Sequence, residues 1–258
     1  MRIVRHAVLM SALVAMSALI ASAQGRGGGR GGPPQPPQTP KVAAPIDLVG
    51  TWGAVVTTDW RWRMTTPPKG DYNGVPMNAD ARKVADAWDP AKDEAAGEQC
   101  RAYGAPNILR VPGRIRISWV DDQTLKLETD NGQQTRTLYF GTPQSQGGDW
   151  QGVSQASWDM IAGGANLGGR IPMQSGALKV VTTKFKMGYI RKNGVPYSAN
   201  ANLTEYFDVI KEPNGDTYLV VSSTLVDPTY LNTPYEMAVN FKKQADNSGW
   251  NPAPCTAK

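Results

Sequence analysis

The chain has 258 residues and carries 27 Lys and Arg against 22 Asp and Glu, a formal net charge of +5. Its only histidine is His6, inside an N-terminal segment that is predicted to be removed, so the mature chain has no His-dependent triad and no His-ligated metal site. Without Arg2 and Arg5 of that segment the balance is 25 minus 22, or +3, which is too mild to indicate a nucleic-acid partner.

Residues 1–23 have the pattern of a secretory signal peptide. Two arginines precede the apolar run of residues 7–20, and Ala21-Ser22-Ala23 fits a cleavage site. The run is too short for a membrane span, and no later segment is long and apolar enough for one. We therefore expect an exported protein, periplasmic or secreted. Residues 24–45 are almost entirely Gly, Pro and Gln, which predicts a disordered linker.

Residues 46–258 are long enough for one domain with a real core, and strand patterns dominate them. Asn-Gly turns at 131–132 and 214–215 join alternating runs and predict hairpins. The expected strands are residues 51–58, 114–120, 124–129, 133–140, 152–158, 177–185, 202–210, 217–226 and 235–243. Eight to ten antiparallel strands in chain order favour an all-β, up-and-down barrel.

Two segments depart from the strand pattern. Residues 78–100 are expected to be a short helical insertion, because Asn78 and Asp89 are suitable N-caps and Pro90 suits a first helical position. Residues 160–170 are Gly-rich, but they lack the lysine and the strand-to-helix setting of a phosphate-binding loop. They are expected to form a loop at a pocket mouth or on the surface.

The chain has two cysteines, Cys100 and Cys255. In an exported protein an even pair predicts one disulfide, which would tie the C-terminal tail to the middle of the chain. Two free buried thiols are the alternative. The acidic run at residues 89–98 lacks the spacing of a calcium loop, so no metal and no cofactor is expected.

Gly50-Thr51-Trp52, at the start of the first expected strand, resembles the Gly-x-Trp signature of lipocalin-like (calycin) barrels. The resemblance implies an eight-stranded barrel that holds a small, mostly apolar ligand, and it implies that some relatives are enzymes. Such barrels often place an arginine from late in the chain against the tryptophan. Here the last expected strand carries Lys242 and Lys243 instead.

Four longer stretches resemble a group of exported bacterial proteins without an assigned activity. They are QCRAYGAP at 99–106, RVPGRIRISW at 110–119, RKNGVPYS at 191–198 and VDPTYLNTPY at 226–235. This resemblance spans most of the domain. It supports the domain boundaries and implies no mechanism.

Two charged residues share a strand face with apolar neighbours. Arg136 lies on the same face as Leu138 and Phe140, and Glu205 lies on the same face as Phe207, because residues two apart in a strand point the same way. If that face is the barrel interior, the two charges need partners. They either pair with each other or bind a polar group of a ligand, and a desolvated Glu205 would have a raised pKa suited to acid–base catalysis. A structural pair and a solvated face remain the alternatives.

The run DWRWR at residues 59–63 is the other candidate. Read as a strand, it places Trp60 and Trp62 on one face, as a stacking platform for a sugar or an aromatic ligand, and Arg61 and Arg63 on the other. The alternative is that the indoles belong to the core and the arginines are solvated.

The sequence thus predicts an exported lipocalin-like protein that binds a small organic ligand, apolar, aromatic or glycan, in a barrel pocket. One alternative is a histidine-free hydrolase, lyase or isomerase on the same barrel, with Glu205 and Arg136 as catalytic candidates. Another is an interaction module that docks to an envelope protein through its Pro-rich arm. The predicted ligand-binding residues are Trp60, Trp62, Trp119, Arg136, Phe140, Glu205 and Phe207.

Overall fold

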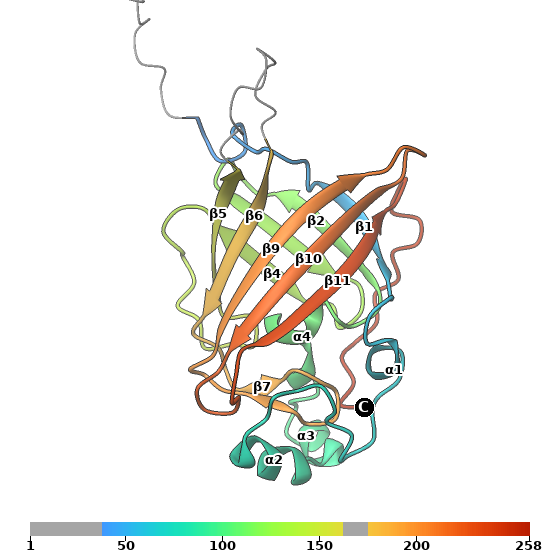
Figure 1. Ribbon diagram of the computed structural model, residues 1–258, viewed down its shortest axis with the longest axis vertical. Helices are drawn as coiled ribbons and strands as arrows, with labels where there is room; N and C mark the ends of the chain where they lie inside the picture. The colour runs from blue at the N-terminus through green and yellow to red at the C-terminus, as the bar shows by residue number, and fades with distance from the viewer. Residues whose placement is uncertain (1–37, 162–174) are drawn as a thin grey trace, which may run out of the picture. The chain divides into compact units, whose positions relative to one another are not determined.

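The computed structural model describes residues 38–161 and 175–258, and it shows a closed β-barrel of nine strands (Figure 1). The prediction of an all-β barrel with eight to ten strands is therefore confirmed. The barrel strands are β1 Gly50–Val55, β2 Arg114–Trp119, β3 Thr124–Thr129, β4 Thr135–Tyr139, β5 Val153–Ile161, β6 Ser175–Thr183, β9 Asn202–Lys211, β10 Thr217–Val226 and β11 Tyr235–Lys243.

The strands follow one another around the barrel in chain order, except that a small hairpin of β7 (Gly188–Tyr189) and β8 (Pro196–Tyr197) leaves the wall between β6 and β9. Neighbours pair antiparallel at every contact but one, where β4 and β5 run parallel. A closed ring with an odd number of strands cannot alternate direction throughout, so one parallel contact is unavoidable. Residues 140–152 make the long return that a parallel pair requires.

The Gly-x-Trp segment closes the barrel, because β1 pairs with β11 on one side and with β2 on the other. Trp52 is fully buried, and its indole Nε1 donates a hydrogen bond to the carbonyl of Leu48 at 2.9 Å. The ammonium of Lys243 lies 5.2 Å from the centroid of the indole ring, within cation–π range. A lysine thus stands against the tryptophan where the resemblance implied an arginine.

Packed side chains fill the middle of the barrel. Alternate residues of each strand point inward, which is why the period-2 pattern of the sequence translates directly into a core. The buried inward residues include Ile115, Ile117, Leu125, Leu127, Leu138, Leu178, Val180, Phe207, Leu219, Val221, Val239 and Phe241.

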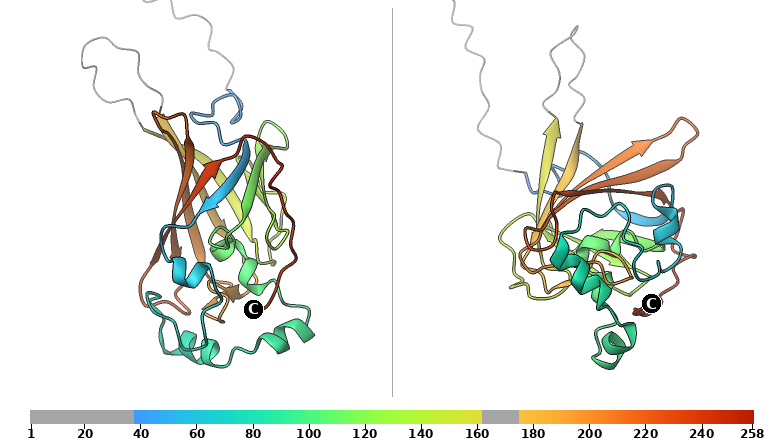
Figure 2. Two further views of the ribbon diagram at one scale, coloured as in Figure 1. Left: turned by 90° about the vertical axis from the view of Figure 1, so that its right-hand side faces the viewer. Right: turned by 60° about the horizontal axis from the view of Figure 1, so that its bottom comes forward.

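Short helices gather at one end of the barrel, together with β7 and β8 (Figures 1 and 2). We call it the closed end. The helices are α1 Trp60–Arg63, α2 Ala79–Asp86, α3 Pro90–Ala95, the 3-10 helix η1 Arg101–Tyr103 and α4 Ala105–Ile108. As predicted, the side chain of Asn78 caps α2 and the side chain of Asp89 caps α3. The helical insertion is longer than predicted, because α1 and α4 lie outside residues 78–100.

The predicted disulfide is present, with 5.1 Å between the Cα atoms of Cys100 and Cys255. It holds the C-terminal tail at the closed end, where Ala253 forms a bridge with Asn131. Farther back along the tail, the indole of Trp250 lies under the guanidinium of Arg116, at 3.9 Å. The tail therefore packs along the outside of the wall before the disulfide secures it.

Residues 38–48 lie across the opposite end of the barrel, which we call the mouth (Figure 1). The amide of Lys41 donates to the carbonyl of Asp122 at 3.2 Å, and the indole of Trp158 donates to the carbonyl of Pro40 at 2.7 Å. The compact unit accordingly begins at Gln38, within the segment that the sequence predicted to be a linker.

The predicted signal peptide, the linker up to residue 37 and most of the predicted Gly-rich loop at 160–170 lie outside the described residues. Among the helices that are described, none has the length and apolar character needed to cross a membrane.

Candidate functional site

A cavity of about 270 Å³ opens at the mouth of the barrel. Leu125 and two tryptophans, Trp119 and Trp158, supply its barrel side, and Lys41 with residues 44–48 supplies the other side. The barrel side is apolar. The charged groups nearby form ion pairs at the rim, with Lys41 3.7 Å from Asp122. The cavity therefore offers ring surfaces on its barrel side, whereas Lys41 and Asp47 place charged groups on the other side.

Three aromatic rings form a cluster at the mouth. The ring centroids of Trp119 and Phe140 are 5.6 Å apart in a stacked arrangement, and Trp158 lies 6.4 Å from Trp119 and 5.1 Å from Phe140 at tilted angles. These spacings are those of favourable aromatic pairs. The cluster is partly buried and packs on the core below it, so its rings are held in place before any ligand arrives.

The strand pattern places these rings. Trp119 continues the inward row of Ile115 and Ile117 at the last residue of β2, and Phe140 continues the inward row of β4 one residue beyond the strand. Trp158 follows the inward Ala156 on β5. Large rings at the mouth-proximal inward positions of three strands converge on one opening.

Sequence reasoning selected Trp119 and Phe140 but missed Trp158. The sequence did contain a signal for it, because Trp158 shares a face with the small residues Ser154 and Ala156 in an expected strand. What was missing was the direction of β5 relative to β4, because an up-and-down order would run the two strands antiparallel and carry Trp158 to the end opposite Phe140. That pair is parallel and comes from a long connection, which hairpin patterns do not predict.

The prediction that Trp60 and Trp62 alternate along a strand is wrong. β1 ends at Val55, Asp59 adopts a left-handed backbone conformation with φ of 54°, and residues 60–63 form the short helix α1. Trp60 is 65% exposed on the surface of the closed end. Trp62 lies at a different cavity, so neither indole reaches the mouth.

Arg136 and Glu205 do face the interior, and they pair with each other. The guanidinium donates to both carboxylate oxygens, with Nη1 to Oε1 at 3.1 Å and Nη2 to Oε2 at 2.6 Å. Both residues are 1% exposed. Of the two outcomes left open by the sequence, mutual pairing is the one observed.

The hydroxyls of Ser154 and Thr182, 2.9 Å apart, complete the surroundings of Nη2 of Arg136. Phe207, another predicted ligand contact, is fully buried in the core beside this pair. The seven predicted ligand residues therefore separate into three groups: the mouth, the buried centre and the closed end. Only Trp119 and Phe140 belong to the mouth.

Two tyrosines at the closed end have pKa values that are shifted in opposite directions. Burial raises the pKa of Tyr189. Burial also acts to raise the pKa of Tyr103, but hydrogen bonds with Thr256 and Lys192 outweigh it and lower the pKa below the usual value. Both phenols stand away from the mouth, so their titration does not bear on the mouth cavity.

Within residues 38–161 and 175–258, no group of three or more His, Cys, Asp and Glu side chains is placed to hold a metal ion. Comparison with known proteins returned no match: no family model fits the chain, and neither a curated protein nor a solved structure is similar to it. The function must therefore be argued from the geometry itself.

Proposed function

We propose that this protein is an exported, lipocalin-like barrel that binds a small ring-bearing organic molecule at its mouth. The observation that carries the proposal is the cavity between Leu125, Trp119 and Trp158 on one side and residues 44–48 on the other. A ring inserted there would contact two indoles without displacing a packed core side chain.

The size of the cavity limits the ligand. Pockets for drug-sized molecules begin at roughly 300 Å³, and the mouth cavity measures about 270 Å³. The cavity therefore takes one aromatic, heteroaromatic or sugar ring system, and a second ring or a lipid chain on the same ligand would have to lie outside it. Apolar side chains at the rim, Val49, Val120 and Met160, are each at least 40% exposed and give such a ligand an apolar approach.

Export is supported by the disulfide, because such bonds persist in oxidising compartments. Catalysis by Glu205 has less support than binding, because both carboxylate oxygens already accept hydrogen bonds from Arg136. We therefore place the ligand at the mouth and assign the buried pair to the architecture of the barrel.

The test uses the neutral fluorescent probe N-phenyl-1-naphthylamine, which has aromatic rings and no anionic group. The wild-type protein should give a saturable rise in probe fluorescence. Trp119→Ala and Trp158→Ala should each weaken binding about tenfold or more, since a lost aromatic contact costs about 1.5 kcal/mol with its buried area.

Trp60→Ala is the matched control, because it removes an equally large indole from the opposite end of the molecule. Its probe affinity should stay within twofold of the wild type, and thermal melting should confirm that all variants are folded. Equal probe affinity in the wild type and both mouth variants would refute the proposal. If the proposal holds, native mass spectrometry of the protein purified from its own compartment would identify the natural ligand.

A further inference from the structure

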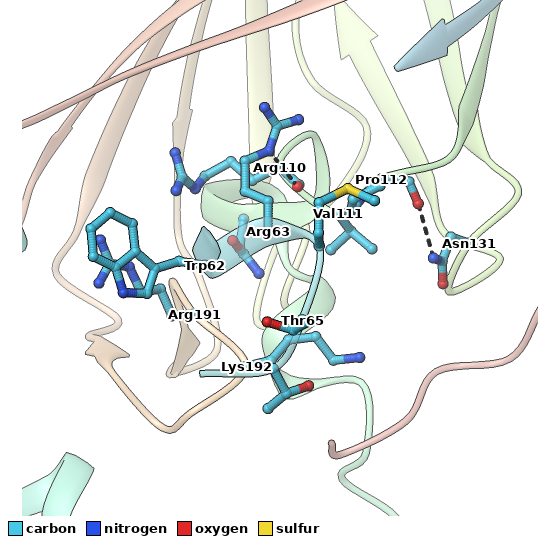
Figure 3. A pocket seen from close by; sticks show the side chains of 12 residues that line it. Trp62, Arg63, Thr65, Arg110, Val111, Pro112, Asn131, Arg191 and Lys192 are labelled. Carbon is cyan, nitrogen blue, oxygen red and sulfur yellow. Dashed lines mark hydrogen bonds between the residues drawn. The ribbon is translucent and has the colours of Figure 1, made fainter. Parts of the chain in front are cut away.

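A second cavity, of about 220 Å³, lies at the closed end of the barrel (Figure 3). It is independent of the mouth and shares no lining residue with it. Its walls come from α1 and the residues after it, from α4 and the residues after it, from the turn between β7 and β8, and from Asn131. The residues that matter here are Trp62, Arg63, Arg110, Arg191 and Lys192.

Four cations line this cavity, and three of them are nearly buried. The exposed fractions of Arg63, Arg110 and Arg191 are 8%, 5% and 3%. Only Arg110 has a carboxylate partner among the described residues, with Nη2 2.8 Å from Oδ2 of Asp59. Because the residues that line the cavity in the described structure include no Asp or Glu, the positive charge there exceeds the negative charge.

The hydrogen-bond donors of the cavity are also unsatisfied. Nη2 of Arg63, Nη1 of Arg110, and both Nε and Nη1 of Arg191 are buried without a hydrogen-bond partner in the described part of the chain. The indole Nε1 of Trp62 is also buried without a hydrogen-bond partner there. Buried N–H groups are almost always paired in folded proteins, with protein, ligand or ordered water. The five donors without a protein partner gather around one cavity, where an anion could accept from them.

The polar bonds that do exist hold these side chains in place. Nε of Arg63 donates to the carbonyl of Arg110 at 2.9 Å, which ties α1 to the segment just after α4 (Figure 3). The guanidinium of Arg191 lies 4.8 Å from the ring centroid of Trp62. Nζ of Lys192 donates to the hydroxyls of Tyr103, at 3.1 Å, and Thr256, at 3.0 Å. The donors are thus preorganised by contacts that leave part of each group free.

The electrostatic environment of Arg63 agrees with this geometry. Burial, followed by the neighbouring charge of Arg110, lowers the pKa of Arg63 to about 10, and Asp59 offsets only part of the effect. Arg63 stays charged at neutral pH, but in surroundings that disfavour its charge. A bound anion would remove that disadvantage.

We propose that this cavity binds a tetrahedral oxyanion, the phosphate or sulfate group of a small monoester. The donors come from different elements, with Arg63 and Arg110 on one side of the cavity and Trp62 and Arg191 on another (Figure 3). An acceptor with three or more oxygens can meet donors from several directions, whereas the two oxygens of a carboxylate lie in one plane. Guanidinium groups are the usual partners of such oxyanions.

The small volume of the cavity limits the size of the organic group that the oxyanion can carry. The cavity measures about 220 Å³, below the roughly 300 Å³ at which drug-sized pockets begin. It holds the oxyanion with a small organic group. The indole of Trp62 is the one aromatic side chain on its wall in the described structure.

The test is isothermal titration calorimetry with inorganic phosphate, sulfate and glucose 6-phosphate, each at the same ionic strength. Chloride and acetate are the controls for charge alone. At least one of the three tetrahedral oxyanions should bind saturably and more tightly than acetate. In the wild type, the indole N–H resonance of Trp62 should shift with the same dependence on ligand concentration.

Two variants locate the binding. Arg191→Gln removes a cation with two free nitrogens and should weaken oxyanion binding at least tenfold. Arg61→Gln is the matched control, because Arg61 lies on the same helix as Arg63 but points to Asp71, at 2.9 Å. Its affinity should stay within twofold of the wild type. If Arg191→Gln does not fold, Arg63→Lys replaces it, since lysine keeps the charge and loses the planar pair of donors.

Three results would overturn the proposal. One is the absence of saturable binding by phosphate, sulfate and glucose 6-phosphate. Another is acetate binding as tightly as any of them. The third is an oxyanion affinity within twofold of the wild type in the folded Arg191 or Arg63 variant. Because the probe for the mouth is uncharged and its variants lie at the other end, failure of either proposal leaves the other intact.

Discussion

The buried pair of Arg136 and Glu205 gives the sharpest prediction about stability. Glu205→Gln removes one charge and leaves the guanidinium of Arg136 in the core with only hydroxyl and amide partners. Breaking a buried ion pair in this way costs about 3–5 kcal/mol, because the remaining charge is desolvated and unpaired. Replacing both residues, as Arg136→Met with Glu205→Leu, should cost less than about 1 kcal/mol or even stabilise the fold.

The structure supports the large value. Both side chains are 2% exposed or less, and the pair is bidentate, so neither water nor another carboxylate can replace the lost partner without a rearrangement. The hydroxyls of Ser154 and Thr182 are already bonded to each other at 2.9 Å. They offer the orphaned guanidinium acceptors but no negative charge.

The assay is urea unfolding of the oxidised protein, followed by far-ultraviolet circular dichroism. With an m-value of roughly 2–3 kcal/mol/M, a loss of about 3–5 kcal/mol moves the midpoint down by about 1–2.5 M. The double variant should recover most of that shift. Measured together with the single variants Arg136→Met and Glu205→Leu, it completes a double-mutant cycle that yields the coupling between the two sites. A midpoint shift below about 0.3 M for Glu205→Gln would refute the reasoning, since it would mean that the site takes up water or that the pair is already solvated.

Three further predictions concern other parts of the barrel. Replacing Cys100 and Cys255 with serine should lower the free energy of unfolding by about 5 kcal/mol on the chain-entropy model, since the bond spans a sequence separation of 155; a loss below about 1 kcal/mol in urea would contradict that account. Burial and, to a smaller extent, the charge of Asp159 raise the pKa of Asp208, so the ionised carboxylate disfavours folding at neutral pH. Asp208→Asn should therefore raise the melting temperature at pH 7. This advantage should disappear as the pH falls below the pKa of Asp208 in both the folded and the unfolded state. Trp52→Phe removes the indole hydrogen bond at the barrel closure and part of the buried ring, and should cost about 2–3 kcal/mol in urea unfolding; an unchanged midpoint would show that the closure does not depend on the indole.

The two proposed sites lie at opposite ends of the barrel and differ in chemistry. The mouth offers rings and apolar surface around Trp119 and Trp158, and the closed end offers unpaired guanidinium groups around Arg63 and Arg191. The buried centre between them is filled, and there Arg136 and Glu205 form a bidentate ion pair in which only Nε of Arg136 has no partner among the described residues. A ligand at one end therefore has no open route through the core to the other.

Local sequence patterns determined most of the wall. Alternation with period 2 and two Asn-Gly turns were enough to predict the hairpins, because side-chain direction in a strand depends only on position along that strand. The same rule predicted that Arg136 and Glu205 face inward. Residue type predicted the helix caps Asn78 and Asp89, because the hydrogen bonds of a cap reach only two or three residues ahead.

The run at 59–63 shows where such patterns fail. Two tryptophans alternating with arginines satisfy the strand rule, yet four residues are too few to separate a strand from a helical turn. The left-handed backbone at Asp59 and the hydrogen bond from Arg63 to Arg110, just after α4, decided between them. Those contacts join residues 47 positions apart in the chain, which no local pattern contains.

Both candidate sites were decided by tertiary structure. The sequence determined that Trp119, Phe140 and Glu205 would point inward, but which inward residues meet depends on the order and register of strands around the ring. The parallel contact of β4 with β5 brought Trp158 to the mouth. The packing of α1, the segment after α4 and the turn between β7 and β8 brought Arg63, Arg110 and Arg191 to one cavity. The physical reason is the same in both cases: direction along a strand is a local property, whereas proximity between distant segments is set by packing and closure of the whole barrel.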